Sequence, residues 1–402
     1  MACAILPTTL RRANTTVGIA VRVPALRALE IASKTPGSAS IQRRATIRTL
    51  STKTARMFQA SCHTSRTASA IPSTTTQNAL NTTECTMSTT ACSADLPREW
   101  IVEDTAGAID LANAINCSGG VFNVEWRGHV NVTETLLISE LTVVNITGVT
   151  GVGIDGSPAI ADGNGEIRIF IVLNATLHLN GMTLKQGYAY AGGAVFVFRG
   201  TVVFSGQTSI VNNVAGATGG AMFVHGGVVS WDGNMTVADN SCFSNGGAFI
   251  LRYGSSLSWS GNTTFFGNRI GSFGTDGGKS VGGAIYAEED SNISWSGDTR
   301  FIGNSVDVGD IGREVMCYGG AVAVSADSEA AWSGRTTFDD NDAGFCGGAL
   351  YANNTGTLSW TGETVFSTNQ ATRGGAVCVE WFSDASWSGP TTFVGNNGSA
   401  NG

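Results

Sequence analysis

Three residues of this sequence, His225, Arg252 and Glu288, carry side chains that together could abstract a proton. Each lies six residues after the start of a Gly-Gly pair, in three successive copies of a sequence repeat. If the copies stack, a base, a cation and a carboxylate come side by side, which suits proton abstraction. A solvated strand face with ordinary cross-strand pairs explains the same column. We favour this second interpretation, because a fold does not by itself confer chemistry.

The elements that must position these side chains belong to a repeat with three motifs in fixed order. The motifs are Gly-Gly-Ala, an aromatic residue followed in most copies by Ser-Gly, and Phe-x-x-Asn. Their marker residues are Gly192, Gly219, Gly246, Gly282, Gly319, Gly347 and Gly374; Phe204, Trp231, Trp259, Trp295, Trp332, Trp360 and Trp387; and Asn213, Asn240, Asn268, Asn304, Asn341, Asn369 and Asn396. Most copies are 27 or 28 residues apart. A fixed period of this length is typical of stacked repeat architectures.

Each motif predicts one short strand. Residues after Gly-Gly-Ala alternate, and the inward column is always apolar: Val195, Met222, Phe249, Ile285, Val322, Leu350 and Val377. Alternation with a period of two predicts strands, whereas Gly-Gly at the head of every element excludes a helical solenoid. We therefore predict an all-β parallel solenoid with three strands per coil, coils of about 27 residues and a Trp core. Gly-Gly and Asn are expected at corners, with Asn in the left-handed backbone region.

The paired motifs resemble the repeat of the chlamydial polymorphic outer membrane proteins. Matching pieces include Gly282-Gly-Ala-Ile285 with Phe301-Ile-Gly-Asn304, and Gly347-Gly-Ala-Leu350 with Phe366-Ser-Thr-Asn369. The match covers about residues 180 to 396. The resemblance implies a right-handed, single-stranded parallel β-helix of the pectin-lyase-like kind, displayed on a cell surface or secreted and acting in adhesion. Polysaccharide lyases, hydrolases and epimerases share this fold.

The chain divides into three segments. Residues 1–96 contain 11 Lys or Arg against three acidic residues, and are rich in Ser and Thr. They predict a targeting-like peptide, a disordered tail or a wrongly translated upstream region. Residues 97–190 predict a cap and degenerate coils, with a short helix that begins at Asp104. Residues 191–402 hold the seven regular coils, and the lack of a cap after Asn396 suggests that the array continues.

Cysteines and Asn-x-Ser/Thr triplets bear on the compartment. Cys317 and Cys346 precede successive Gly-Gly pairs. Stacking would bring their Cα atoms within the roughly 4.4 to 6.8 Å that a disulfide requires. Cys378 is expected to be an inert buried or half-buried thiol. The glycosylation candidates are Asn262, Asn292, Asn353 and Asn397, although an Asn-, Ser- and Thr-rich solenoid also produces such triplets by chance.

Several functions are disfavoured by composition. Residues 96–402 hold 12 basic against 28 acidic side chains, which argues against nucleic-acid binding. No apolar run is long enough for a membrane-spanning helix. The acidic turn at Asp339, Asp340 and Asp342 lacks known Ca²⁺-loop spacing, so we expect a hydrated corner and no metal or cofactor.

The sequence therefore leads us to expect a non-catalytic, extracellular or surface-exposed β-helix, adhesin-like, that binds a polysaccharide or a protein. One expected binding face is an outward column with the members Phe196, Phe223, Ile250, Tyr286 and Tyr351, unless these residues merely cover a neighbouring loop. Two alternatives remain: a carbohydrate-active enzyme that uses His225, Arg252 and Glu288, and a structural spacer.

Overall fold

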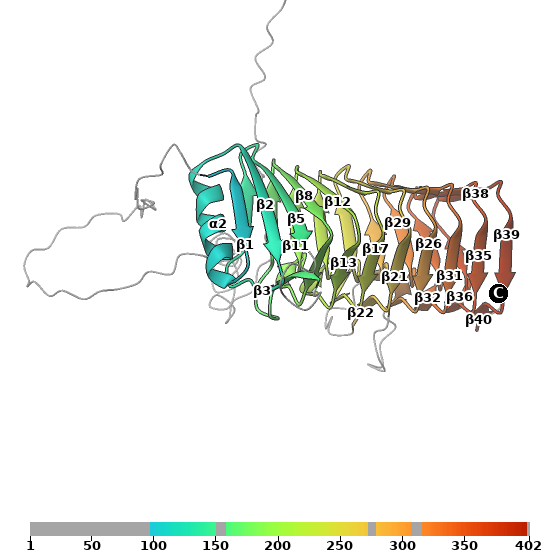
Figure 1. Cartoon of the computed structure of the whole chain (residues 1–402). Helices are drawn as coiled ribbons and strands as arrows, with labels where there is room; N and C mark the ends of the chain where they lie inside the picture. Colours follow the sequence, from blue (N-terminus) through green and yellow to red (C-terminus); the bar gives the residue numbers. More distant parts are fainter. Residues whose placement is uncertain (1–96, 150–157, 272–278, 307–315, 400–402) are drawn as a thin grey trace, which may run out of the picture. The chain divides into compact units, whose positions relative to one another are not determined.

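The computed structural model describes residues 97–149, 158–271, 279–306 and 316–399. The expectations for residues 1–96 lie outside these ranges. The described chain is a right-handed parallel β-helix with one helix at its N-terminal end, α2 (Thr105–Cys117) (Figure 1). The predicted fold class is therefore confirmed.

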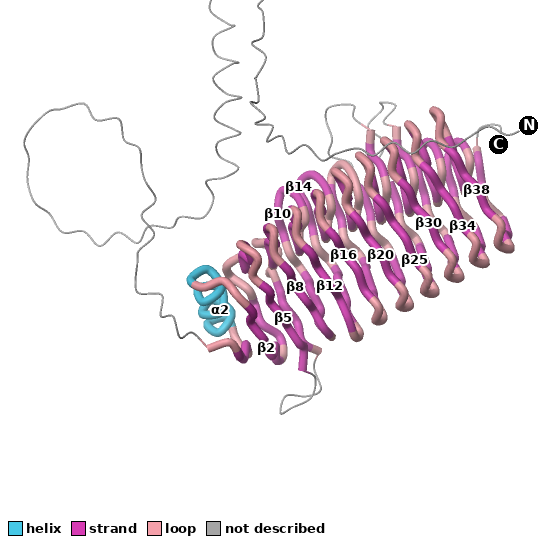
Figure 2. The backbone as a smooth tube through the Cα atoms, turned by 90° about the horizontal axis from the view of Figure 1, so that it is seen from above, coloured by secondary structure: helices cyan, strands magenta, loops and turns pink. Residues whose placement is uncertain are grey.

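The strands form four long sheets, in which each strand pairs in parallel with its equivalent in the next coil. Sheet A contains β1 (Glu99–Val102), β2 (Val121–Arg127), β5 (Val143–Val149), β8 (Thr176–Asn180), β12 (Thr201–Ser205), β16 (Val228–Trp231), β20 (Ser256–Trp259), β25 (Asn292–Trp295), β30 (Glu329–Trp332), β34 (Thr357–Trp360) and β38 (Asp384–Trp387). Figure 2 shows many of these strands side by side along the coils.

Sheet B contains β3 (His129–Asn131), β6 (Ala159–Asp162), β9 (Met182–Lys185), β13 (Thr208–Val211), β17 (Met235–Ala238), β21 (Thr263–Phe266), β26 (Thr299–Ile302), β31 (Thr336–Asp339), β35 (Thr364–Ser367) and β39 (Thr391–Val394). Sheet C contains β4 (Leu136–Ser139), β7 (Phe170–Leu173), β11 (Val195–Phe198), β15 (Met222–His225), β19 (Phe249–Arg252), β24 (Ile285–Ala287), β29 (Val322–Ser325), β33 (Leu350–Asn353) and β37 (Val377–Val379). A regular coil runs through sheets C, A and B in that order, as the three motifs predict.

A fourth sheet corrects the expected number of strands per coil. Sheet D contains β10 (Tyr188–Ala191), β14 (Val214–Thr218), β18 (Ser241–Cys242), β22 (Arg269–Ile270), β23 (Ser280–Val281), β27 (Ser305–Val306), β28 (Cys317–Tyr318), β32 (Asp342–Cys346), β36 (Gln370–Arg373) and β40 (Asn397–Gly398). These strands follow the Asn motif or precede Gly-Gly. They have two to five residues each, so their alternation is too short to be recognised from sequence.

The predicted N-terminal helix is confirmed. Asp104 is its N-cap, and the carboxylate Oδ1 of Asp104 accepts a hydrogen bond of 2.8 Å from the backbone N–H of Gly107. Its buried residues include Leu111 and Ile115, and the helix packs on β1, β3 and β4. The helix thereby covers the apolar core at the first coil, as a solenoid cap must.

The Trp column forms the core of the regular coils. Register pairs Trp231 with Trp259 and Trp259 with Trp295, and the pairing continues to Trp387. Ring centroids of successive indoles lie 4.6 to 5.0 Å apart, with interplanar angles of 1 to 7°. From Trp231 to Trp360, each indole N–H donates to a threonine hydroxyl of the next coil, for example Trp295 Nε1 to Thr336 Oγ1 at 2.8 Å. The buried ring therefore has no unsatisfied donor.

The Asn column is a buried asparagine ladder. The side-chain amide Nδ2 of Asn304 donates to Asn341 Oδ1 at 3.0 Å and to the carbonyl oxygen of Phe265 at 3.0 Å. The left-handed residue is the one before each Asn, such as Asp340 with φ 53°, and not the Asn itself. Our expectation for the backbone was therefore wrong by one position, because the Asn side chain satisfies backbone groups of neighbouring coils rather than its own turn.

The two glycines of each Gly-Gly pair have different roles. Gly282 has φ +76°, a backbone conformation that residues with a side chain rarely adopt. Gly283 has an ordinary φ, but a Cβ there would lie 1.9 Å from the carbonyl oxygen of Gly320 in the next coil. The first glycine makes the corner and the second permits coils to approach each other.

Candidate functional site

The structure brings His225, Arg252 and Glu288 together as predicted. His225 and Arg252 are register partners at the ends of β15 and β19. The guanidinium Nε of Arg252 forms an ion pair with Glu288 Oε1. Because this pair is partly buried and each charge has its partner, the guanidinium is already committed to a structural contact.

His225 is packed between aromatic rings. Its imidazole stacks on Phe198 with a distance of 4.9 Å between ring centroids. The ring of Tyr253 is tilted against the imidazole, with a centroid distance of 4.3 Å. Partial burial lowers the pKa of His225, and the charges of Arg199 and Arg252 lower it further, against the opposite effect of Glu289. His225 is therefore neutral near pH 7 and could accept a proton, although its ring is held as part of an aromatic stack.

Tyr286 connects this row to its neighbours. Its side chain is 7% exposed. The hydroxyl donates to Glu288 Oε2 at 3.0 Å and lies 2.7 Å from Ser325 Oγ. Burial raises the pKa of Tyr286 well above its usual value, and the charge of Glu288 raises it further. The phenol therefore stays protonated and keeps its role as a donor.

The outward column that was a predicted binding face is mostly covered. Ile250, Tyr286 and Tyr351 are buried, in one cluster with Val281 and Tyr318 of sheet D. The alternative interpretation, cover by a neighbouring segment, is confirmed for these residues. Phe196 and Phe223 remain half-buried, and their rings stack at 5.3 Å.

A cleft of about 400 Å³ adjoins the buried tyrosines. Its walls are formed by Lys279, Val281, Tyr286, Ser325, Tyr351, Asn353, Asn354 and Trp381. The hydroxyl of Tyr351 donates to Glu380 Oε2 at 3.2 Å. The sequence did not predict the cleft, because Lys279 and Trp381 lie outside the repeated motifs.

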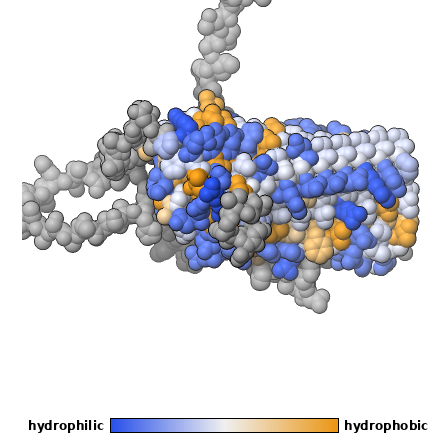
Figure 3. Space-filling view, viewed as in Figure 1, coloured by the Kyte–Doolittle hydropathy of each residue, from blue (hydrophilic) through white to orange (hydrophobic). Residues whose placement is uncertain are grey.

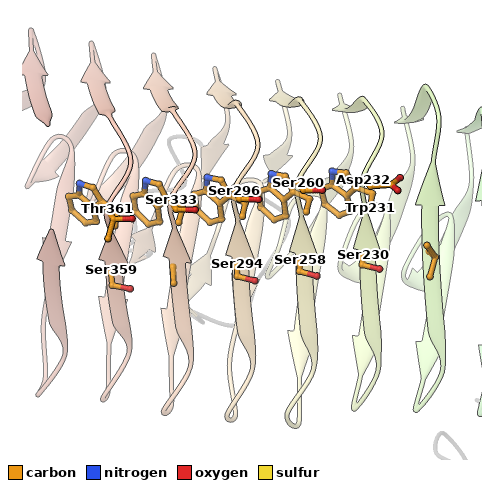
Figure 4. A pocket seen from close by; sticks show the side chains of 16 residues that line it. Ser230, Trp231, Asp232, Ser258, Ser260, Ser294, Ser296, Ser333, Ser359 and Thr361 are labelled. Atoms are coloured by element: carbon orange, nitrogen blue, oxygen red, sulfur yellow. The ribbon is translucent and has the colours of Figure 1, made fainter. Parts of the chain in front are cut away.

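A second hollow, the sheet A groove, runs across six coils, from β12 to β34, and has a volume of about 670 Å³. Two rows of small hydroxyl side chains line it on either side of the buried indoles (Figure 4). The rows are Ser230, Ser258, Ser294 and Ser359, and Ser260, Ser296, Ser333 and Thr361. Asp232 supplies the one charge among the lining side chains. The groove therefore offers regularly spaced hydroxyl groups to an extended ligand.

A polar hollow of about 600 Å³ lies over strands β17, β21, β26 and β31 of sheet B. It is lined by residues that include Asn262, Asp298, Arg300 and Arg335. The space-filling view shows hydrophilic residues in a band along these coils (Figure 3). The ion pair of Arg335 with Glu363, 3.6 Å, is exposed and therefore contributes little.

The disulfide corrects the predicted pairing. Cys346 is bonded to Cys378, with a Cα–Cα distance of 5.8 Å, and not to Cys317. Pairing of β28 with β32 places Tyr318 opposite Cys346, so Cys317 is one residue out of register. The expectation that Cys378 is an inert thiol is also wrong. Cys378 is within reach because β37 of the next coil starts directly above the corner that follows Cys346.

The glycosylation candidates lie on the surface. Asn262, Asn292 and Asn397 are exposed and Asn353 is half-buried. Asn292 begins β25, beside the sheet A groove, and Asn353 ends β33. Three of the four are therefore exposed, whereas Asn353 lies in the wall of the cleft beside Tyr286 and Tyr351.

Two groups bear on metal binding. In the acidic turn, Asp339 Oδ1 accepts hydrogen bonds from Ser367 Oγ at 2.6 Å and Thr368 Oγ1 at 2.9 Å. Elsewhere in the described ranges, Cys346, Cys378 and Glu380 have ligand atoms close together. Because the two sulfurs form the disulfide, only Glu380 keeps a ligand atom there.

A buried carboxylate in the irregular coils was not anticipated. Asp162 is 3% exposed and contacts His129 Nε2 at 2.7 Å and Lys185 Nζ at 3.2 Å. The backbone N–H of Asn164 donates to it at 2.8 Å. Burial alone would raise the pKa of Asp162, but these donors outweigh it and the net pKa is lowered. The degenerate coils provided no column that could have identified this cluster.

Acid is expected to weaken the irregular coils through Asp162. Because its folded pKa is below the unfolded value of 3.8, its stabilisation is complete above that value and is lost as the pH falls through the folded pKa. We expect Asp162→Asn to lower the thermal midpoint at pH 7 and to reduce its fall between pH 4 and pH 2. The control is Asp298→Asn, at an exposed carboxylate. Equal acid sensitivity in both variants would contradict the prediction.

No protein-family model, curated protein or solved structure matches the chain. Among the described residues, no helix is both long and apolar enough to cross a membrane.

Proposed function

We propose that this chain is a surface-exposed or secreted, adhesin-like β-helix that binds a polysaccharide through the sheet A groove without catalysis. The observation that carries the proposal is the pair of hydroxyl rows along five coils of the groove. Repeated hydroxyls can both donate and accept hydrogen bonds, as the hydroxyls of a linear sugar polymer also do. A polymer parallel to the solenoid axis would meet a hydroxyl of each row in four of the five coils, about 4.8 Å apart, since Ala331 interrupts the first row and Asp232 stands at the start of the second.

Three further features support this setting. The Cys346–Cys378 disulfide favours an oxidising compartment, such as the secretory route or the cell exterior. The resemblance to the polymorphic outer membrane protein repeat favours display at a surface. Accessible sequons such as Asn262 are compatible with a glycoprotein. A protein ligand is the second possibility for the groove.

A tyrosine placed in the groove tests the proposal. We expect Ser294→Tyr to weaken binding to the preferred polysaccharide of a glycan array at least about ten-fold, because the ring fills the middle of the groove. Ser294 is exposed, so the fold should tolerate the change. The matched control is Thr236→Tyr, at an exposed position on sheet B. Absence of any saturable glycan would favour a protein ligand or a structural spacer instead.

A carbohydrate-active enzyme is the alternative function. The observation that favours it is neutral His225 beside the Arg252–Glu288 ion pair. In that case His225 would be the base, and the ion pair would orient an acidic substrate. Incubation with uronic-acid polymers separates the two proposals. If the chain turns over such a polymer and Glu288→Ala abolishes the turnover, the protein is an enzyme and the binding proposal is wrong.

A further inference from the structure

We propose that the cleft beside Tyr286 and Trp381 binds a single neutral sugar ring. The inference takes its ligand class from the proposed function, but its site is separate from the sheet A groove. The cleft volume of about 400 Å³ suits a small ligand rather than a chain of many sugar units.

The polar groups of the cleft suit hydroxyl groups. Ser325 offers a hydroxyl, while Asn353 and Asn354 offer amides that both donate and accept. Ser325 is held in place by its contact with the buried Tyr286 hydroxyl, 2.7 Å away. Side chains fixed in this way can bind a ligand without losing much further freedom.

Trp381 supplies an aromatic platform. It lines the cleft and is 70% exposed. Its φ is 50°, and the next residue, Phe382, has φ 62°. The equivalent corner residues of the two preceding coils are Asn354 and Ala326, which are small. Tyr253, at the same corner of an earlier coil, is also left-handed, with φ 57°, and its ring contacts His225. An aromatic ring at this corner can therefore make contacts on the outer face, and the ring of Trp381 lies at the cleft.

Charge decides for a neutral sugar. Lys279 is the single charged residue among those that line the cleft. Just behind the wall, however, Glu288 and Glu380 accept hydrogen bonds from Tyr286 and Tyr351. The excess of acidic residues over residues 96–402, 28 against 12, adds a negative field around the solenoid. Because Arg252 balances Glu288, the charges that remain are Lys279 in the wall and Glu380 behind Tyr351, and they give no net charge that would favour a carboxylated or sulfated sugar over a neutral ring.

Saturation-transfer NMR on the full chain tests the inference. The probes are glucose, galactose and N-acetylglucosamine, with glucuronate as the anionic comparison. We expect saturable binding of at least one neutral sugar, with a dissociation constant on the order of 1 mM for a ligand of this size. Trp381→Ala should weaken it about ten-fold through loss of the ring contact, and Trp381→Phe should retain most of it.

Two control variants locate the site. Phe382→Ala removes an adjacent exposed ring that does not line the cleft, and should leave sugar binding unchanged. Ser294→Tyr should weaken polysaccharide binding in the sheet A groove but leave binding of the single sugar unchanged. The two measurements therefore show separately whether the proposed function or the cleft inference is wrong. The inference is overturned if no neutral sugar binds saturably, if glucuronate binds as well, or if Trp381→Ala has no larger effect than Phe382→Ala.

Discussion

Replacement of Trp295 by Ala is expected to destabilise the regular coils by about 3 to 5 kcal/mol. The indole is buried and lies between Trp259 and Trp332, with centroid distances of 4.8 and 4.6 Å. Its removal leaves a cavity that cannot collapse, because backbone pairing in sheet A fixes the coils on both sides. It also takes the indole donor away from Thr336 Oγ1.

The measurement must resolve individual coils, because long repeat arrays need not unfold in one step. Hydrogen exchange of the β25 and β26 amides should therefore accelerate in Trp295→Ala, together with a lower urea midpoint. The matched control is Trp387→Ala, at the same motif position but 52% exposed. An equal effect of both substitutions would show that the column is not the main source of stability.

Much of this core could be predicted because each motif is repeated. Trp259 and Trp295 share a position in successive copies, and stacked coils place equal positions above each other. The same comparison brought His225 and Arg252 together correctly. The helix after Asp104 was predictable from local capping chemistry alone.

The errors lie where neighbouring coils differ. Cys346 bonds to Cys378 rather than to Cys317 because β28 pairs with β32 one residue out of step, with Tyr318 opposite Cys346. A comparison of the motifs cannot reveal this offset. Burial of Tyr286 depends on cover from Val281 and Tyr318, outside the motifs. The cleft and the sheet A groove depend on surface shape, and a strand pattern predicts only which side a residue faces.

The Asn ladder should be as important as the Trp column. We expect Asn304→Ala to destabilise its coil by about 4 kcal/mol. Removal of this buried amide leaves several polar groups without a hydrogen bond, and each such group costs about 1 to 3 kcal/mol. Asn304 Oδ1 accepts from Asn268 N at 3.1 Å and from Asn268 Nδ2 at 2.9 Å. Asn304 Nδ2 donates to Asn341 Oδ1 and to the carbonyl oxygen of Phe265.

The position and chemistry of Asn304 allow a sharp test. Asn304→Asp keeps the acceptor but removes the amide donor and places a carboxylate opposite the acceptor oxygen of Asn341. It should therefore also destabilise the coil, and do so more at pH 7 than at pH 3, because protonation restores a donor. Asn292→Ala in the same coil is the control, since Asn292 is exposed. Hydrogen exchange of β26 and β27 amides reports the local opening. If Asn304→Ala exchanges no faster than Asn292→Ala, the ladder amides contribute no net stability, and the stacked rings and backbone pairing must hold the coils together without them.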